Sequence, residues 1–178
     1  MPKLTQVKET KRGRYALFFD GEFAFSLDED TFAMAGLHTG DELEEWQIHD
    51  LQTKSDTRKA VDKAMDLLAL RDHAAGELYQ KLCRSFDPHS AAAAVAKMQE
   101  LNLLDDAGFA RRRAAELLRK RKSRRAILDD LHAKGIDRGA AAEAVEALFA
   151  QSEEDEEENP ELANARALVE RHYAAKLA

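Results

Sequence analysis

The first part of the chain has a pattern of hydrophobic and polar positions that is typical of β-strands. The segment "YALFFDGEFAFSL" holds two runs rich in apolar and aromatic residues on either side of Asp20-Gly21. This dipeptide favours a two-residue type I′ turn, because both of its positions need a positive φ angle. The pattern predicts a β-hairpin, with a further strand in "TQVKETK", a short helix in "DEDTFAMAG" between an aspartate cap and Gly36, and a return to the sheet in "GDELEEWQIHDL".

From Ser55 onward the apolar residues lie three and four positions apart, which is the period of amphipathic helices. Comparison of the chain with itself at an offset of fifty residues shows that this helical part contains an internal repeat. Alanines could match by composition alone, so the leucine, arginine and aspartate pairs carry the inference. These pairs are Leu67/Leu117, Leu68/Leu118, Arg71/Arg121, Leu78/Leu128 and Asp87/Asp137. Each copy predicts three helices, and such repeats stack to bury a shared core.

Capping residues predict where the helices of the second copy begin and end. A long helix is expected from about Asp106 to Lys122, and another starts after Ser123 and stops at Gly135. A third helix begins after Asp137.

The first copy shows the same signals, with Asp72 as a cap and with Asp87-Pro88 as a cap followed by a proline at the first helical position. A third copy begins, because Leu168 and Arg171 continue the two series of matches. Only the first helix of this third copy is expected.

The predicted fold is mainly α, with tandem three-helix repeats in an elongated arrangement that follow a small β-rich N-terminal module. The expected divisions are the β-rich module at 1–54, the first repeat at 55–105, the second repeat at 106–150, an acidic linker at 151–160 and the first helix of an incomplete third repeat at 161–178.

Composition agrees with a cytoplasmic helical protein. Apolar residues make up 44% of the 178 residues, which is enough for a core, and charged residues make up 34%, which suggests long surface helices. The chain has no apolar run of the roughly twenty residues that a membrane span needs and no signal-peptide pattern at its start. The single cysteine, Cys83, fits a reducing compartment and is interpreted as a small core residue.

Charge is unevenly distributed along the chain, although the net charge is -7. Residues 1–57 hold six basic and twelve acidic groups, residues 58–149 hold eighteen and fourteen, and residues 150–178 hold three and eight. The stretch "RRRAAELLRKRKSRR" contains nine basic residues among fifteen. They are Arg111, Arg112, Arg113, Arg119, Lys120, Arg121, Lys122, Arg124 and Arg125.

On a helix, Arg112, Arg113, Glu116, Arg119 and Lys120 fall outside a packing stripe. The stripe consists of Ala107, Ala110, Ala114, Leu117, Leu118 and Arg121. Arg124 and Arg125 stand in the first turn after Ser123, where the helix dipole makes basic residues unfavourable by about 0.3 to 1 kcal/mol each. Free amides beside two arginines suit an anion such as phosphate. Because the stretch lacks base-reading amides and stacking rings, we expect all nine residues to contact a polyanion or acidic partner without reading sequence.

The sequence offers little support for catalysis. The six histidines show no ligand spacing, and Asp105 and Asp106 are more simply a helix cap and a dipole partner than a metal site or an acid–base pair. No phosphate-binding loop, dinucleotide motif or nucleophile elbow is present. We therefore predict a protein that is not an enzyme, with no catalytic residues, no metal site and no cofactor.

The segments "LLALRDHAAGELYQKL", "LNLLDDAGFARR" and "KSRRAILDDLHAKGID" resemble, in this order, the signatures of RecX proteins, the bacterial regulators of the RecA recombinase. The likeness covers about residues 60–148. It implies tandem three-helix repeats and a protein that binds RecA filaments on DNA and modulates, by inhibition in the leading interpretation, ATP hydrolysis and strand exchange. RecX proteins usually complete a third repeat, and the N-terminal hairpin region would be an additional extension.

Within the resemblance, Asn102 stands where a glycine is common, and asparagine also tolerates the left-handed conformation of a helix end. Leu104, Asp105, Asp106 and Phe109 are interpreted as structural, while the nine basic residues are the candidates for contact. The implied partners are the RecA filament and DNA, with no membrane, and the chain is expected to be a monomer.

Two other functions remain open from the residues: a helical protein that binds DNA or RNA directly without RecA, and a scaffold that joins other proteins. The acidic run Glu153–Glu158 is interpreted as a solvated linker, with an electrostatic cover for the basic helix as the alternative.

Overall fold

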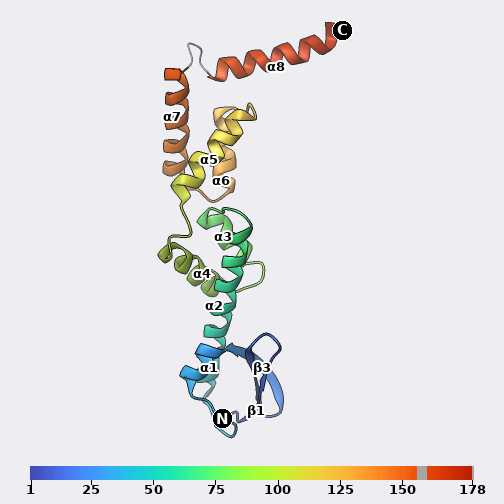
Figure 1. Ribbon diagram of the computed structural model, residues 1–178, viewed down its shortest axis with the longest axis vertical. Coiled ribbons are helices and arrows are strands. Elements are labelled where there is room, and N and C mark those ends of the chain that lie inside the picture. The colour runs from blue at the N-terminus through green and yellow to red at the C-terminus, as the bar shows by residue number, and fades with distance from the viewer. Residues whose placement is uncertain (156–159, 178) are drawn as a thin grey trace. The chain divides into compact units, whose positions relative to one another are not determined.

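The computed structural model describes the backbone of residues 1–155 and 160–177 and the side chains of 1–152 and 161–174. It confirms a mainly helical fold preceded by a small antiparallel sheet (Figure 1). By their contacts the residues form two compact units, Met1–Leu67 with Lys81–Glu100 and Leu68–Gln80 with Leu101–Ala178. No helix in the described part of the chain is both long and apolar enough to cross a membrane.

The sheet of the first unit has three antiparallel strands in chain order: β1 (Leu4–Glu9), β2 (Arg14–Phe19) and β3 (Glu22–Asp28). The predicted hairpin between β2 and β3 is confirmed. Asp20 and Gly21 both have positive φ angles, 49° and 89°, as a turn of this type requires.

One face of this sheet is buried under a short helix and the start of a long one. The helix α1 (Glu29–Ala35) begins at Asp28, whose carboxylate accepts from the Thr31 N–H at 3.1 Å, and closes at Gly36 with a φ of 59°. Both caps were expected from the sequence. The shared core of this region consists of Leu4, Leu17, Phe19, Phe25, Leu27, Leu43 and Leu51.

The expected return of "GDELEEWQIHDL" to the sheet is wrong. Its first residues hydrogen-bond to the start of the chain, with the Leu4 N–H donating to the Asp41 carbonyl at 2.8 Å and an isolated bridge between Glu42 and Lys3, but they form no further strand. The long helix α2 (Glu45–Leu70) begins directly after Glu44. The Gln47 side chain accepts from the Glu44 N–H at 2.9 Å and helps to start the helix. Its apolar residues Ile48 and Leu51 then have helical spacing toward the core under the sheet.

The helix α4 (Pro88–Glu100) confirms the cap predicted at Asp87-Pro88. The Asp87 carboxylate accepts from the Ser90 N–H at 3.0 Å, and the buried Ser90 hydroxyl lies 3.5 Å from the Thr57 hydroxyl of α2. Cys83, which was expected in the core, is exposed instead. It follows the last residue of α3 (Ala75–Leu82), where Leu82 takes the buried position.

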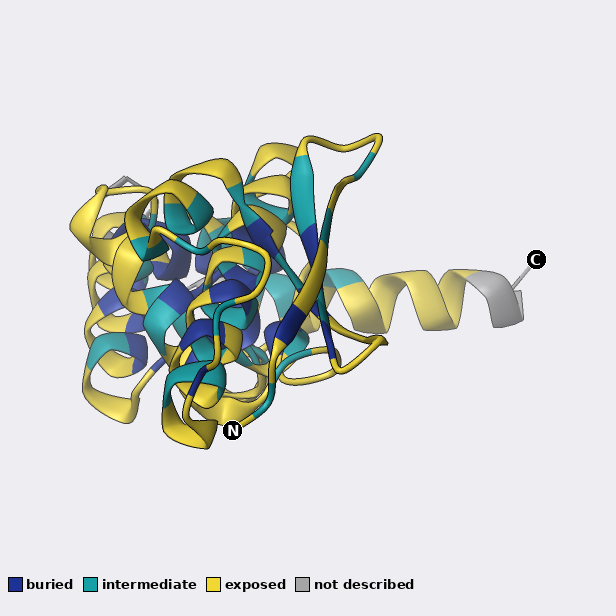
Figure 2. Cartoon of the chain, turned by 90° about the horizontal axis from the view of Figure 1, so that it is seen from below, coloured by how far each residue is buried: buried dark blue, intermediate teal, exposed yellow. Residues whose placement is uncertain are grey.

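The second unit contains α5 (Asp106–Arg119), α6 (Arg124–Ala133) and α7 (Arg138–Asp155), which we call the second repeat, and α8 (Pro160–Leu177). The buried residues of the second repeat come from α5, α6 and α7. Over its described residues α8, the helix that leads to the label C in Figure 2, is mostly exposed. The core of this repeat is built around Phe109, Ala110, Ala114, Leu117, Ile127, Leu131, Ala141, Val145 and Phe149.

The start of α3 is joined to α5 and to the end of α6, all within the second unit. Asp106 accepts from the Ala75 N–H at 2.8 Å, so Asp72, the predicted cap, is not the cap. The reason is that α3 begins three residues beyond Asp72. A Cβ atom built on Gly76 would lie 2.8 Å from the Gly135 Cα, which means that the two backbones touch.

Candidate binding surface of the second repeat

The nine candidate residues lie on α5, on the first turn of α6 and on the short link between these helices. Asp105 caps α5 by accepting from the Gly108 N–H at 2.9 Å, and Ser123 caps α6 by accepting from the Ala126 N–H at 3.3 Å. The sequence predicted that α5 extends to about Lys122, but the helix ends at Arg119. The link therefore exposes Lys120, Arg121 and Lys122 outside regular helix.

The end of α5 has the hydrogen bonds of a Schellman motif. The Lys122 N–H donates to the Leu117 carbonyl at 3.0 Å, and the Arg121 N–H donates to the Leu118 carbonyl at 2.8 Å. Arg121 has a φ of 59°, although glycine is the usual residue at this position. A basic side chain is thus held in a left-handed conformation that is costly for residues other than glycine.

The predicted packing stripe of α5 is correct in its middle and wrong at its ends. Ala110, Ala114 and Leu117 are buried, whereas Ala107 and Arg121 are exposed. Because the Asp105 cap starts the helix at Asp106, Phe109 begins the buried face in place of Ala107. Arg121 lies outside the stripe because the helix has already ended.

Arg113 is the candidate whose guanidinium binds two carboxylates of the second repeat. Its Nε and Nη2 atoms donate to the two carboxylate oxygens of Asp130 at 2.8 and 2.9 Å, and its Nη1 donates to Glu116 at 3.1 Å. These bonds raise the pKa of Arg113 and lower the pKa of Asp130. The side chain ties α5 to α6, and its donors already face acceptors.

Four other candidates make contacts that a partner could replace. Arg112 pairs with Asp72 at 3.0 Å, Lys120 pairs with Glu116 at 2.5 Å, and Arg121 donates to the Asn164 side chain at 3.2 Å. Arg124 pairs with Glu146 and lies over the Phe149 ring, 4.6 Å from its centroid. Exposed pairs of this kind contribute about 0 to 1 kcal/mol to stability, so little free energy is lost when such a pair is exchanged for a contact with another anion.

The remaining four candidates are Arg111, Arg119, Lys122 and Arg125. All four are exposed, and none forms an ion pair or a side-chain hydrogen bond with another described residue. They follow one another from α5 through the link into α6. Their guanidinium and ammonium groups are the donors on this surface that are available to a partner.

At the start of α6, where the sequence predicted an anion-binding site, the group that binds is a carboxylate of the same chain. Glu161 of α8 accepts from the Arg124 N–H at 3.3 Å. An acidic group at this place agrees with the chemistry of free amides at the positive end of a helix dipole. The acidic run Glu153–Glu158, interpreted as a linker or a cover, has its side chains outside the described residues.

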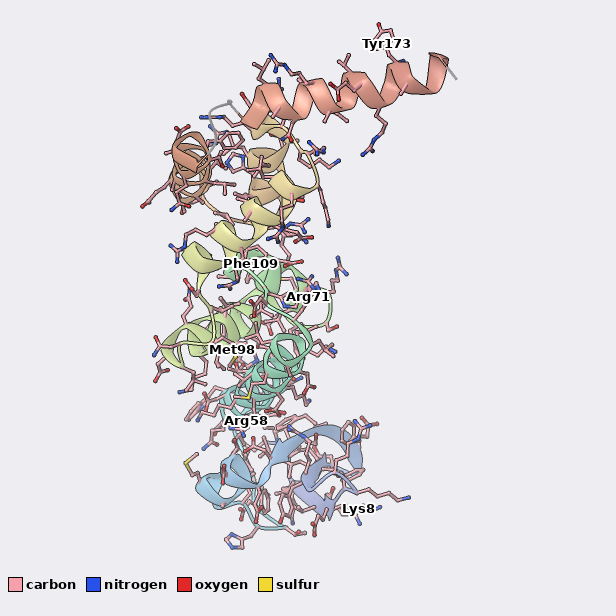
Figure 3. The ribbon with its side chains drawn as sticks, turned by 45° about the horizontal axis from the view of Figure 1, so that its top comes forward. Lys8, Arg58, Arg71, Met98, Phe109 and Tyr173 are labelled. Carbon is pink, nitrogen blue, oxygen red and sulfur yellow. The ribbon has the colours of Figure 1, made fainter. Side chains whose placement is uncertain are left out.

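Two basic residues that the sequence interpretation missed lie beside this surface. Arg71 and Lys134 line a pocket of about 530 Å³ together with Arg112, Arg113 and Arg119. The match of Arg71 to Arg121 at the offset of fifty residues was a signal that could have found one of them. Two residues that line this pocket, Arg71 and Phe109, are labelled in Figure 3.

Arg71 and Lys134 meet at one carboxylate, that of Glu77. Arg71 Nη2 lies 2.7 Å and Lys134 Nζ lies 3.0 Å from its Oε1 atom. Burial raises the pKa of Glu77, but the hydrogen bonds from Arg71 and Lys134 outweigh this effect and hold the pKa at about 2. Glu77 therefore neutralises two of the cations that line the pocket, while Arg119, which also lines it, forms no ion pair with another described residue.

Within residues 1–152 and 161–174, the His, Cys, Asp and Glu side chains form no group of three or more that could hold a metal ion. What the surface offers is a set of cationic donors, some free and some weakly paired, on a rigid pair of helices.

Comparison with known proteins gives one consistent result. A regulatory protein RecX of Lactobacillus gasseri is 31% identical over an alignment of 179 positions, which covers 99% of this chain and 64% of that protein. A regulatory protein RecX of Caldanaerobacter subterraneus is 27% identical over 84% of this chain and 77% of its own length. One from Lactobacillus delbrueckii is 36% identical over 140 residues, which are 77% of this chain and 52% of that protein.

The fold comparison points the same way. A crystal structure of regulatory protein RecX matches with a TM-score of 0.67 and 22% identity, and the match covers 98% of this chain and 85% of that one. No protein-family model matches the chain. This chain spans about half to two thirds of the length of the two Lactobacillus proteins and 77% of the Caldanaerobacter protein.

Proposed function

This chain belongs to the RecX family, and from this premise we propose that it is a regulator that binds RecA filaments on DNA and inhibits the ATPase and strand exchange of the recombinase. The observation that carries the proposal is the row of four exposed cations, Arg111, Arg119, Lys122 and Arg125, that lack ion-pair partners among the described residues. The regulatory names of the relatives support it. The effect is regulatory and not catalytic, and the chain acts as a monomer.

The row of cations suits a nucleoprotein partner. Guanidinium and ammonium groups bind phosphate and carboxylate. Contacts to phosphate do not depend on the base sequence, which is read at the base edges in the grooves. A RecA filament presents DNA phosphates together with protein surface. Arg112, Lys120, Arg121 and Arg124 would join the contact by exchanging their weak intrachain partners for groups of the filament.

Arg113 has a different part in this proposal. Its bidentate bond to Asp130 keeps α5 and α6 in register, so that the free cations on both helices stay on one surface. Replacement of Arg113 would lower binding by disturbing this geometry and would also lower stability. Replacement of Arg119 or Arg125 would lower binding with the fold unchanged.

The deciding experiment measures RecA ATPase on single-stranded DNA with and without the protein. The proposal expects inhibition, and it expects the inhibition to weaken when Arg111, Arg119, Lys122 and Arg125 are all replaced by Gln. A control variant with Gln at Lys54, Arg58, Lys63 and Lys97 has the same change in charge, at basic residues of α2 and α4. It should inhibit as the parent protein does.

A second function, direct binding of DNA or RNA without RecA, is distinguished by the same proteins. If that function holds, the parent chain binds the strand and leaves the ATPase of a saturated filament unchanged. Each phosphate-binding cation that is removed should then flatten the slope of log affinity against log salt by about 0.7 to 0.9. An ATPase that is inhibited equally by the parent and by the variant with the four surface replacements would refute the assigned surface.

A further inference from the structure

The outer face of the N-terminal sheet carries an aromatic pair that the core does not use. Phe18 of β2 faces Phe23 of β3 in register, with ring centroids 5.7 Å apart and an interplanar angle of 69°. Phe23 is 60% exposed. Lys8 of β1 lies over the Phe18 ring, 5.4 Å from its centroid, and its side chain points away from the sheet in Figure 3.

Charge divides this module sharply. Residues 1–19, which form β1 and β2, hold five basic residues and one acidic residue. Residues 20–57 hold one basic and eleven acidic residues. The acidic average of the module therefore conceals a basic hairpin, and the aromatic pair lies on that hairpin and the strand beside it.

The cations of the hairpin differ in how they are used. Arg14 is occupied, because its Nη2 atom donates to the Ser26 carbonyl at 2.9 Å and to the Ser55 hydroxyl at 3.1 Å. Lys8, Lys11 and Arg12 are exposed and form no ion pair with another described residue. Lys11 and Arg12 stand in the turn between β1 and β2, at the opposite end of β2 from Phe18, so a strand of several nucleotides would extend from the rings to these cations.

We propose that this outer face binds a single-stranded nucleic acid, with bases stacked on Phe23 and Phe18 and phosphates held by Lys8, Lys11 and Arg12. Unstacked bases need exposed aromatic faces, and a sheet with aromatic residues beside basic ones supplies both stacking and charge. An acidic peptide would be attracted by the same cations but would have no need of the rings. The contact goes beyond the proposed function, since it requires neither RecA nor the second repeat.

A single-tryptophan reporter tests the stacking directly. Trp46 is the only tryptophan, is 68% exposed and lies on α2, so a Trp46→Phe, Phe23→Trp variant places the sole indole on the proposed face. Addition of oligothymidylate should quench this fluorescence, because the base covers the ring. An abasic strand of equal length, which keeps the phosphates, should leave it unquenched. Equal quenching by both strands, or quenching by neither, would overturn the proposal.

Affinity supplies the second readout, measured with oligothymidylate in the background that lacks the four surface cations of the second repeat. There Phe23→Leu, which keeps apolar bulk but removes the ring, should weaken binding by about five- to a hundredfold. Trp46→Leu, at an exposed aromatic residue of the acidic part, is the matched control and should bind unchanged. Replacement of Lys8, Lys11 and Arg12 by Gln should flatten the salt dependence by about 0.7 per cation removed.

The outcomes separate this inference from the proposed function. If the protein fails to inhibit RecA while the reporter is quenched by bases, the sheet contact stands and the RecA proposal fails. If Phe23→Leu leaves oligonucleotide binding intact but abolishes inhibition of RecA, the face is a protein contact and the nucleic-acid proposal is wrong. A far-UV circular dichroism spectrum equal to that of the parent shows that each variant is folded.

Discussion

The starts of α3 and α6 correspond at about the sequence offset of fifty residues, and each receives a carboxylate from a helix further along the chain. Asp106 of α5 accepts from the Ala75 N–H at 2.8 Å, and Glu161 of α8 accepts from the Arg124 N–H at 3.3 Å. In both cases, an acidic residue in the first turn of a later helix accepts a hydrogen bond from a free amide at the start of an earlier helix.

The first turns of the two helices carry opposite charge. In α3, Glu77 lies near the positive end of the dipole and binds both Arg71 and Lys134. In α6 the same turn carries Arg124 and Arg125 and no acid. One helix start is arranged for stability, whereas the other keeps two cations at an unfavourable place, at a cost of about 0.3 to 1 kcal/mol each. The pair with Glu146 and the contact with Phe149 offset this cost for Arg124. Arg125 forms no ion pair with another described residue, so stability does not explain its charge.

The greatest loss of stability should come from neutralising Glu77, the carboxylate near the start of α3 that binds Arg71 and Lys134. Glu77→Gln should lower the free energy of unfolding at neutral pH by about 3 kcal/mol, because the pKa of Glu77 is lowered from 4.5 to about 2. A lowered pKa means stability that is complete above pH 4.5 and disappears as the pH falls toward 2. Urea unfolding of both proteins across this range checks the sign: their difference should shrink on acidification. A difference that is constant with pH would contradict the assignment.

A side chain that pushes apart the backbones of Gly76 and Gly135 should have the next largest effect on stability. Gly76→Ala places a Cβ atom 2.8 Å from the Gly135 Cα, and because that neighbour is backbone it cannot swing aside. We expect a loss of about 1 to 3 kcal/mol, as for other overpacked sites. Gly139→Ala in α7 is the control, since its Cβ meets only the Asp137 side chain at 3.2 Å. Thermal unfolding should show the control unchanged or more stable and Gly76→Ala less stable.

At the end of α5, a glycine should stabilise the fold where it weakens binding. Arg121→Gly relieves the left-handed conformation of Arg121 and should raise the free energy of unfolding by about 1 kcal/mol. The same change removes one cation and its bond to Asn164. Lys122→Gly removes a cation from the next position, where φ is not positive, and should not stabilise. Equal stability of the two variants would show that the conformation at Arg121 is not strained.

The smallest change in stability is expected from a variant that reverses the contrast between α3 and α6. Arg125→Glu gives the first turn of α6 an acid, as α3 has, and should stabilise the protein by about 0.5 kcal/mol through the helix dipole. Arg125 is exposed and unpaired with any described residue, so the replacement breaks no ion pair among them. Inhibition of RecA should weaken in the same variant. Stronger inhibition together with higher stability would mean that Arg125 is not part of the binding surface.

Features that depend on a few neighbouring residues could be predicted from the sequence. The Asp20-Gly21 turn, the caps at Asp28 and Ser123 and the left-handed Asn102 with its φ of 55° were all expected and are confirmed. Each rests on a hydrogen bond or a steric limit within one turn of chain. Such local interactions are nearly independent of how the rest of the molecule packs.

Other features required the tertiary structure, because their partners are distant in sequence. The amides of α3 find Asp106 and not Asp72, and Arg113 finds Asp130 on the next helix. The segment after Glu44 is helical, because helical spacing brings Ile48 and Leu51 to the core under the sheet.

The composition of the candidate surface shows the same division. That nine basic residues gather on two consecutive helices can be read from the sequence, since their positions follow from helical period and capping. Tertiary packing then selects which of them are paired within the molecule and which, such as Arg119 and Arg125, remain without an ion pair among the described residues. A charge is free or paired according to what packing places within about 4 Å of it, and that distance is set by the fold as a whole.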